Sequence, residues 1–196
     1  MARIVVTEFV TLDGVFEDPG GSEDFERGGW AFQFERGEDG DKFKLDETMS
    51  SDALLLGRRT WEEFAKHWPE REGEFADKFN DSTKYVVSST VSDPESVWSN
   101  SQVIGLDEIG ELRSRDGGDV VVHGSGRLAR ALLEKGLVDE LRLMVFPVVL
   151  GAGKRLFGDG DGAGAAPQQP LRLVESRPVG PDGVVLLIYG PKGDDD

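Results

Sequence analysis

Residues 53–64, Ala-Leu-Leu-Leu-Gly-Arg-Arg-Thr-Trp-Glu-Glu-Phe, decide the fold class of this 196-residue chain. The apolar run 53–56 has the length of a buried strand, Gly57 interrupts it, and Thr60 then opens a helix. Thr60 and Glu63 have the spacing of a capping box, in which each side chain satisfies a backbone N–H group near the helix start. The sequence therefore predicts a strand, a tight Gly-Arg turn and a helix N-terminus.

This turn is suited to an anionic ligand. The first turn of a helix offers free N–H groups and the positive end of the helix dipole, and Arg58 and Arg59 stand beside it. In a chain with a net charge of −16, an arginine pair at this place favours a bound anion, most simply a phosphate. The alternative is a surface arginine pair that bridges to nearby carboxylates.

A second turn of this kind follows the β-branched run 119–123. Residues 124–129, Gly-Ser-Gly-Arg-Leu-Ala, match the G-x-G-x-x-A pattern, in which glycines allow close backbone approach and a helix N-terminus holds a pyrophosphate. A tight strand-to-helix turn without a ligand would show the same pattern. Asp139 and Glu140 precede the next strand instead of ending it, so no ribose-binding carboxylate is well placed.

The third candidate is the hydroxyl run Ser88-Ser89-Thr90, which ends an apolar strand beginning at Lys84. Hydroxyls at a strand end can bind phosphate or ribose, or they can stabilise a turn through bonds to the backbone. Because parallel strands end at the same rim of a sheet, we expect all three turns on one rim. Three such turns with an arginine pair favour a phosphorylated dinucleotide, and NADPH over NADH, since a 2′-phosphate needs cationic partners.

The rest of the chain predicts a single α/β sheet. Glu140–Val149 is a long apolar strand, and its Pro147 indicates an edge or a bulge. Leu171–Pro178 and Val184–Tyr189 flank a Gly-Pro-Asp-Gly turn and form an antiparallel hairpin. The total is about eight strands and four or five helices, in one domain over residues 1–190 with an acidic disordered tail over 191–196.

A polar loop over residues 17–40 carries four aromatic residues, which is unusual for such a segment. It is either a lid or pocket wall, or a loop held to the core by its rings.

Composition narrows the function classes. The net charge of −16 disfavours nucleic acid and anionic membranes as partners. The chain has no cysteine, so thiolate metal sites and cysteine nucleophiles are excluded, and its two histidines lack ligand spacing, so no metal site is expected. No apolar run reaches about 18 residues and no leader is apparent, which favours a cytoplasmic protein. The acidic surface is also compatible with a halophilic host.

The ordered set of motifs resembles the dihydrofolate reductase superfamily: strand and Gly-Arg-x-Thr-Trp-Glu, strand and Ser-Ser, strand and Gly-x-Gly, then a long strand. Residues 11–14, Thr-Leu-Asp-Gly, and residues 147–157, Pro-Val-Val-Leu-Gly-Ala-Gly-Lys-Arg-Leu-Phe, are similar to one branch, the RibD C-terminal domain family of riboflavin-pathway reductases. The resemblance covers residues 2–190. It implies an NADPH-dependent reductase with a mainly parallel eight-stranded sheet flanked by helices, similar to 5-amino-6-(5-phosphoribosylamino)uracil reductase, and a homodimer acting on a small molecule.

The resemblance also implies roles for individual residues. The adenosine-side phosphates would lie on Gly57, Arg58, Arg59 and Thr60. The ribose region would lie on Ser88, Ser89 and Thr90, and the pyrophosphate on Gly124, Ser125, Gly126, Arg127 and Leu128. The nicotinamide and the substrate would meet near Thr11, Asp13, Gly14 and Pro147.

Two carboxylates are candidates for catalysis. Asp13 would orient the substrate or relay a proton, although an Asp before Gly is also a common turn former. Asp41 is the nearest counterpart of the acid that dihydrofolate reductases carry on this helix, although it also suits a solvated helix start. Two alternative functions stay open: dihydrofolate reduction, and nucleotide binding without reductase turnover.

Overall fold

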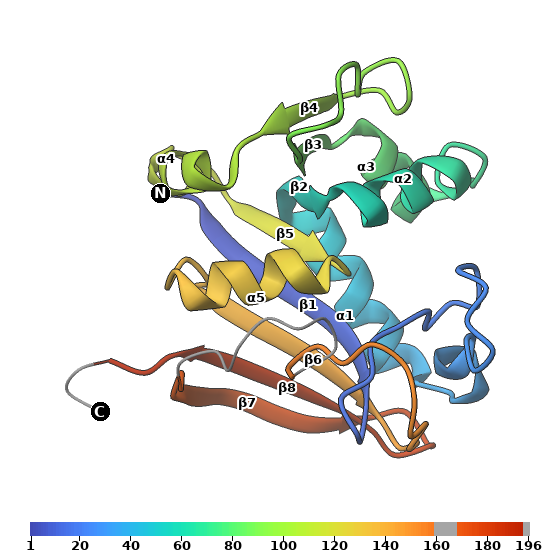
Figure 1. Cartoon of the computed structure of the whole chain (residues 1–196). Helices are drawn as coiled ribbons and strands as arrows, with labels where there is room; N and C mark the ends of the chain where they lie inside the picture. The colour runs from blue at the N-terminus through green and yellow to red at the C-terminus, as the bar shows by residue number, and fades with distance from the viewer. Residues whose placement is uncertain (159–167, 194–196) are drawn as a thin grey trace.

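Eight strands form one sheet in this computed structural model, which describes residues 1–158 and 168–193 (Figure 1). Across the sheet the order is β4-β3-β2-β5-β1-β6-β8-β7. The first six strands in this order are parallel, and β8 pairs antiparallel with β6 and β7, which confirms the predicted class. The strands are β1 Arg3–Thr11, β2 Ser51–Gly57, β3 Thr83–Val87, β4 Ser101–Ile104, β5 Asp119–His123, β6 Glu140–Phe146, β7 Leu171–Val179 and β8 Val184–Pro191.

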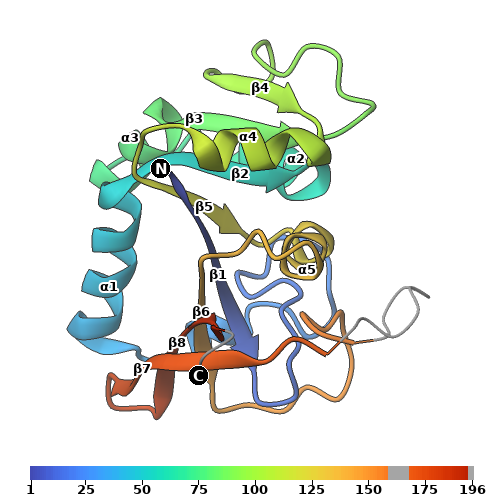
Figure 2. The same cartoon turned by 90° about the vertical axis from the view of Figure 1, so that its left-hand side faces the viewer.

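Helices cover both faces of the sheet, with α1 on one side and α5 on the other (Figure 2). Side chains alternate along β2: Leu54 and Leu56 pack with residues of α2 and α3, whereas Ala53 and Leu55 pack with residues of α4 and α5. The helix following β2 and the helix following β5 therefore lie on opposite faces. The helices are α1 Gly37–Ser50, α2 Arg58–His67, α3 Glu74–Asp81, α4 Ile109–Ser114 and α5 Gly126–Glu134, with 3-10 turns η1 Trp30–Gln33 and η2 Leu106–Glu108.

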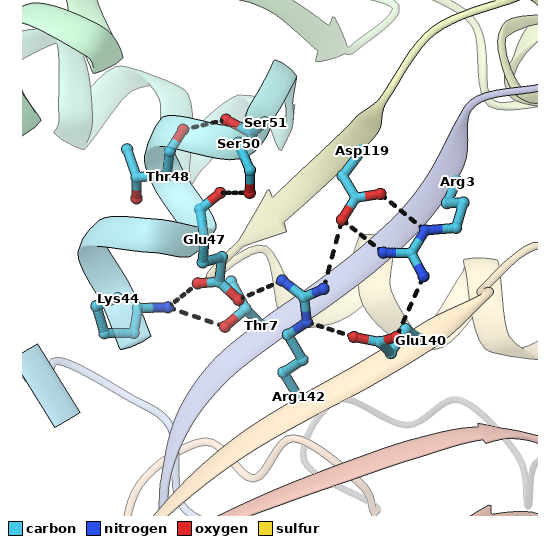
Figure 3. A network of polar contacts seen from close by, with 10 residues as sticks. All are labelled: Arg3, Thr7, Lys44, Glu47, Thr48, Ser50, Ser51, Asp119, Glu140 and Arg142. Carbon is cyan, nitrogen blue, oxygen red and sulfur yellow. Dashed lines mark hydrogen bonds and ion pairs between the residues drawn. The ribbon is translucent and has the colours of Figure 1, made fainter. Parts of the chain in front are cut away.

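A network of charged side chains joins α1 to the sheet (Figure 3). Glu47 of α1 pairs with Lys44 and, at 3.1 Å, with Arg142 of β6. Arg142 also contacts Glu140 at 2.5 Å and Asp119 at 3.4 Å. We call this set the buried network; its members are Thr7, Lys44, Glu47, Asp119, Glu140 and Arg142, and the half-exposed Arg3 contacts it through Asp119 and Glu140.

Two local predictions are wrong. The strand predicted over Glu140–Val149 ends at Phe146, because β6 is an interior strand between β1 and β8 and Pro147 has no N–H group for the ladder. The capping box is absent: α2 begins at Arg58, so Thr60 lies inside its first turn and has another partner, described below.

The aromatic loop combines both predicted roles. Trp30 is fully buried, and its ring contacts Phe146 edge-on at 5.4 Å, so this part of the loop is held to the core. Glu17, Pro19 and Glu23 of the loop line the cleft described below. Phe32 is 78% exposed.

The C-terminal boundary is only partly described. β8 extends to Pro191, and residues 194–196 of the predicted tail lie outside the described residues, so the division at residue 190 stays a prediction. Over the part of the chain that the structure describes, no helix is long and apolar enough to cross a bilayer.

Candidate ligand-binding cleft

The neighbouring strands β2 and β5 are parallel, but their chains turn away to opposite faces after Gly57 and after His123. Such a switch point opens a crevice beyond the carboxyl ends of the two strands. The crevice here is a cleft of about 470 Å³. Two of the three predicted anion-binding turns line it, over residues 57–60 and 124–128.

Hydrogen bonds tie these two turns together. The N–H group of Gly57 donates to Oγ of Ser125 at 2.9 Å, and the N–H group of Ser125 donates to Oγ1 of Thr60 at 2.9 Å. Ser125 adopts the left-handed conformation with φ of 60°, which is uncommon for a residue with a side chain. The serine and the threonine therefore set the relative position of the two helix starts.

Neither helix start has a side-chain cap within the described residues. The first N–H groups of α2 and α5 therefore face the cleft without the partner that an N-cap would give them. At α5 the ring of Phe16 packs against Gly126, where a Cβ atom would lie 2.3 Å from Cζ of Phe16. A side chain at residue 126 would force Phe16 to move.

The cleft wall carries charges of both signs. Arg58 pairs with Glu62 one turn along α2, at 2.8 Å, whereas Arg59 makes no ion pair within the described residues. Lys154 pairs with Glu17, and both line the cleft. Of the two predicted phosphate-binding arginines, Arg59 is thus the one whose charge is not already compensated.

The hydroxyl run after β3 lies on the same rim but not in the cleft wall, where Val87 is the last residue of that strand to contribute. Oγ of Ser88 accepts the N–H groups of Thr90 and Val91 at 3.1 and 3.2 Å, so it stabilises its own turn. The geometry gives Ser88, Ser89 and Thr90 no contact with the cleft, and their ribose role stays a prediction.

Asp13 also lies outside the cleft wall. Its carboxylate accepts hydrogen bonds from Thr11 at 2.6 Å and from the N–H groups of Leu150 and Gly151 at 3.2 and 2.9 Å. Burial by itself raises the pKa of Asp13, but these hydrogen bonds outweigh it and lower the pKa to about 2. Asp13 thereby fastens the 11–15 turn to the segment after β6.

Two of the predicted substrate residues, Thr11 and Gly14, also take part in the hydrogen bonds that hold the 11–15 turn. Oγ1 of Thr11 accepts the N–H group of Val15, and the carbonyl of Gly14 accepts that of Leu156, both at 2.9 Å. Gly14 has φ of 77°, so glycine suits the turn. Thr11, Gly14 and Pro147 do not line the cleft, and their contact with a substrate stays a prediction.

Asp41 belongs to α1, on the face of the sheet opposite to α5 (Figure 2). It lines a separate, open hollow of about 880 Å³ between α1 and the aromatic loop, together with Phe9 and Phe34. Its carboxylate is 65% exposed and pairs with Arg36 at 2.5 Å. An exposed, paired carboxylate gives no support to folate reduction.

Glu8 also lines the cleft, although the sequence did not predict it as a site residue. It was recognisable as a lone acid in the apolar strand β1, at a position that alternation assigns to the core between Val6 and Val10. The residue is 6% exposed.

Comparison with known proteins identifies the family. The RibD C-terminal domain matches residues 2–185. The uncharacterized protein YyaP of Bacillus subtilis is 30% identical over 194 residues, covering 95% of this chain and 94% of YyaP. The uncharacterized protein YwjB of the same organism is 29% identical over 153 residues, covering 76% of this chain and 78% of YwjB.

Solved structures share the fold. A putative riboflavin biosynthesis protein from Shewanella sp. PV-4 superposes with a TM-score of 0.74 at 21% identity, covering 98% of this chain and all of that one. A pyrimidine reductase-like protein from Corynebacterium diphtheriae gives 0.61 at 14% identity, with 98% and 93% covered. RibD from Acinetobacter baumannii gives 0.56 at 18% identity, and this chain spans 58% of it. The chain belongs to the RibD C-terminal domain family.

Proposed function

We propose that this protein is an NADPH-dependent reductase acting on a small heterocycle, similar to the pyrimidine reductases of riboflavin synthesis. The observation that carries the proposal is the cleft at the switch point, where two uncapped helix starts and an uncompensated arginine face the same space. Membership of the RibD C-terminal domain family supports a reductase.

The residues of the cleft fit a phosphorylated dinucleotide. Helix N-termini bind phosphate oxygens through backbone N–H groups and the helix dipole, and α2 and α5 both begin here. Since the N–H groups of Gly57 and Ser125 already have protein acceptors, the pyrophosphate would be held by the following amides of α5. Arg59 would bind the 2′-phosphate. Arg58 would contact the phosphate only if its ion pair with Glu62 were broken.

The protein supplies binding and orientation to such a reaction. A bound reduced nicotinamide would contribute the hydride, so the chain needs few catalytic groups of its own. The apolar side chains of Phe16, Phe64, Val87 and Leu128 line the cleft and would exclude water from the reacting atoms. The Ser125–Thr60 contact would hold the two phosphate-binding helix starts at a constant spacing.

Titration of tryptophan fluorescence with NADPH and NADH tests the proposal. Trp68 contacts Phe64 of the cleft wall with ring centroids 6.0 Å apart, so its emission is expected to respond to the ligand. Replacing Arg59 by Ala removes a charge-assisted contact and is expected to weaken NADPH binding about tenfold or more while changing NADH binding little. Arg115→Ala, at the opposite rim, is the charge-matched control.

Equal weakening for both cofactors would contradict the 2′-phosphate role of Arg59. No fluorescence change and no calorimetric heat with NADPH would contradict the proposal as a whole.

Nucleotide binding without turnover is the second candidate. It is favoured by the placement of Asp13 and Asp41, the two predicted catalytic carboxylates, both outside the cleft wall and both already paired. NADPH oxidation with a panel of pyrimidine and carbonyl substrates separates the two: binding with no oxidation by any of them would favour the second candidate.

A homodimer belongs to this proposal as well. The edge strand β7 exposes Leu171, Leu173 and Val174 by 37–52%, which is compatible with a partner at that edge. Sedimentation of the purified protein measures the oligomeric state.

A further inference from the structure

Glu8 is the most unusual polar group of the cleft. On β1 it shares a face with Val6 and Val10, which pack in the core against α5. The residue is 6% exposed and lines the cleft. Among the described residues, its Oε1 atom is buried and has no hydrogen-bond partner. A buried acceptor without a partner costs free energy, so its presence in the wall of a cleft points to a ligand.

The surroundings of Glu8 favour the neutral form of its carboxyl. Burial raises its pKa well above the usual range, and Glu47 of α1 acts in the same direction. Lys44 of α1 and the N–H group of Gly124 oppose this without reversing it. The other charged or titratable groups around the cleft are His123 at the end of β5, Arg58 and Arg59 of α2, Arg127 of α5, and Glu17, Asp18, Glu23 and Lys154 of the loops.

A neutral carboxyl carries one donor and one acceptor on adjacent oxygens. The complementary group is an amide whose N–H and C=O lie on the same side, because each partner then donates once and accepts once. Both a primary carboxamide and the cyclic amide of a pyrimidinone have this pattern. A phosphate or a carboxylate has no N–H group to offer to the second oxygen.

We propose that Glu8 recognises an amide group of the ligand through this two-point hydrogen-bond pair and thereby sets which end of the ligand enters the cleft. The inference rests on the proposed function and adds the chemical class that the cleft selects. Two sources share the chemistry: the carboxamide of nicotinamide and the cyclic amide of a pyrimidine-type substrate. Glu8 is a binding residue in this inference, and no proton transfer is required of it.

The experiment is a calorimetric titration of the full-length protein and three variants with three probes. The variants are Glu8→Gln, Glu8→Leu and the surface control Glu111→Gln. The probes are NADPH, its 3-acetylpyridine analogue, which lacks the amide N–H group, and uracil, a free cyclic amide. Thermal unfolding of each variant establishes that it is folded.

Loss of the pair is expected to weaken binding about tenfold, the effect of one or two neutral hydrogen bonds. Glu8→Leu should show this loss for the amide probe that pairs with Glu8, and Glu8→Gln should not, since its side chain keeps one donor and one acceptor. Wild-type affinity should fall as the pH rises and the acid ionises, and Glu8→Gln affinity should not. Glu111→Gln should behave as the wild type.

The probes separate the two sources. A tenfold preference of the wild type for NADPH over the acetylpyridine analogue, abolished in Glu8→Leu, assigns the pair to nicotinamide. A loss confined to uracil assigns it to the substrate.

The outcomes for this inference and for the proposed function are distinguishable. If NADPH does not bind but uracil binds in a Glu8-dependent way, the proposed function fails and the inference stands. If NADPH and uracil both bind wild type and Glu8→Leu equally, the inference is overturned and the proposed function stands. Equal pH profiles for wild type and Glu8→Gln, or failure of every probe to bind the wild type, also overturn the inference.

Discussion

The buried network and the cleft are both rich in charge, but only the cleft also holds polar groups that have no partner among the described residues. In the buried network Glu47 has a side-chain exposure of 1% and contacts both Lys44 and Arg142, and Arg142 contacts three carboxylates (Figure 3). In the cleft, Arg59 has no ion pair and Oε1 of Glu8 no hydrogen bond within the described residues. Charges that satisfy one another hold elements together, whereas an unpaired arginine and a buried oxygen without a hydrogen bond are groups that a ligand can satisfy.

The two buried glutamates show the difference in their ionisation. Burial alone raises the pKa of Glu47, but Lys44, His123 and Arg142 outweigh it and lower the pKa, so Glu47 is ionised. For Glu8 burial prevails and raises the pKa, which favours the neutral acid. The surroundings therefore favour the ionised form of Glu47 in the scaffold and the neutral form of Glu8 in the cleft, and variants of each region can test this distinction.

The largest effect is expected for Glu47→Ala. It leaves Lys44, with 11% side-chain exposure, without a counterion, and removal of one member of a buried pair costs about 3–5 kcal/mol. Urea unfolding of wild type and variant measures the loss. Nucleotide binding should persist wherever the variant is folded, and a loss below about 1 kcal/mol would mean that the buried network does not hold α1 to the sheet.

Ser125→Ala should come next, because it removes the acceptor of the Gly57 N–H group at the junction of the two turns. An unsatisfied buried donor costs about 1–3 kcal/mol, and the cleft should also lose affinity for NADPH. Ser125→Gly is the matched control, since it removes the same hydroxyl but relieves the left-handed strain at residue 125. The midpoint temperature of thermal unfolding should be highest for the wild type, lower for Ser125→Gly and lowest for Ser125→Ala. Equal midpoints for the two variants would contradict backbone strain at residue 125.

Asp13→Asn tests a scaffold carboxylate that the sequence predicted to be catalytic. The folded-state pKa of about 2 lies below the usual 3.8, so Asp13 stabilises the fold above pH 3.8 and this contribution is lost as the pH falls toward about 2. The variant should be less stable at neutral pH, and its stability should fall less over that acidic interval. Full reductase turnover by the folded variant would contradict catalysis by Asp13.

The smallest effect is expected for Glu62→Ala. Its pair with Arg58 is exposed on both sides and of the i, i+4 type, so stability should change by no more than about 0.5 kcal/mol. The released Arg58 should bind NADPH about twofold more tightly at low salt. A tenfold gain would show that Arg58, rather than Arg59, is the main phosphate ligand.

Much of the fold was predictable because it depends on local patterns. The apolar runs of β2 and β5, the glycine turns after them and the C-terminal hairpin are all encoded within short segments, and the predicted sheet class is confirmed. The capping box failed because Thr60 makes its bond to Ser125, which is 65 residues away in the chain. Spacing along one segment cannot reveal a partner of that kind.

The candidate site was predictable in part, for the same reason. The Gly57–Thr60 and Gly124–Leu128 turns are recognisable in the sequence from their composition, and both line the cleft. Asp13 resembles a catalytic acid in sequence, and its hydrogen bonds from the N–H groups of Leu150 and Gly151 show a structural role that the sequence did not reveal. Glu8 gave only a weak local signal, a single acid in an apolar strand.

By itself the sequence determined the class of sheet, the turns that end its strands and the family to which the chain belongs, because strand periodicity and turn chemistry act over a few residues. Only the tertiary structure decided which charges neutralise one another and which stay available. That outcome depends on burial and on partners from distant segments: Glu47 meets Arg142 of β6, whereas Glu8 lines the cleft with an oxygen that has no partner in the described chain.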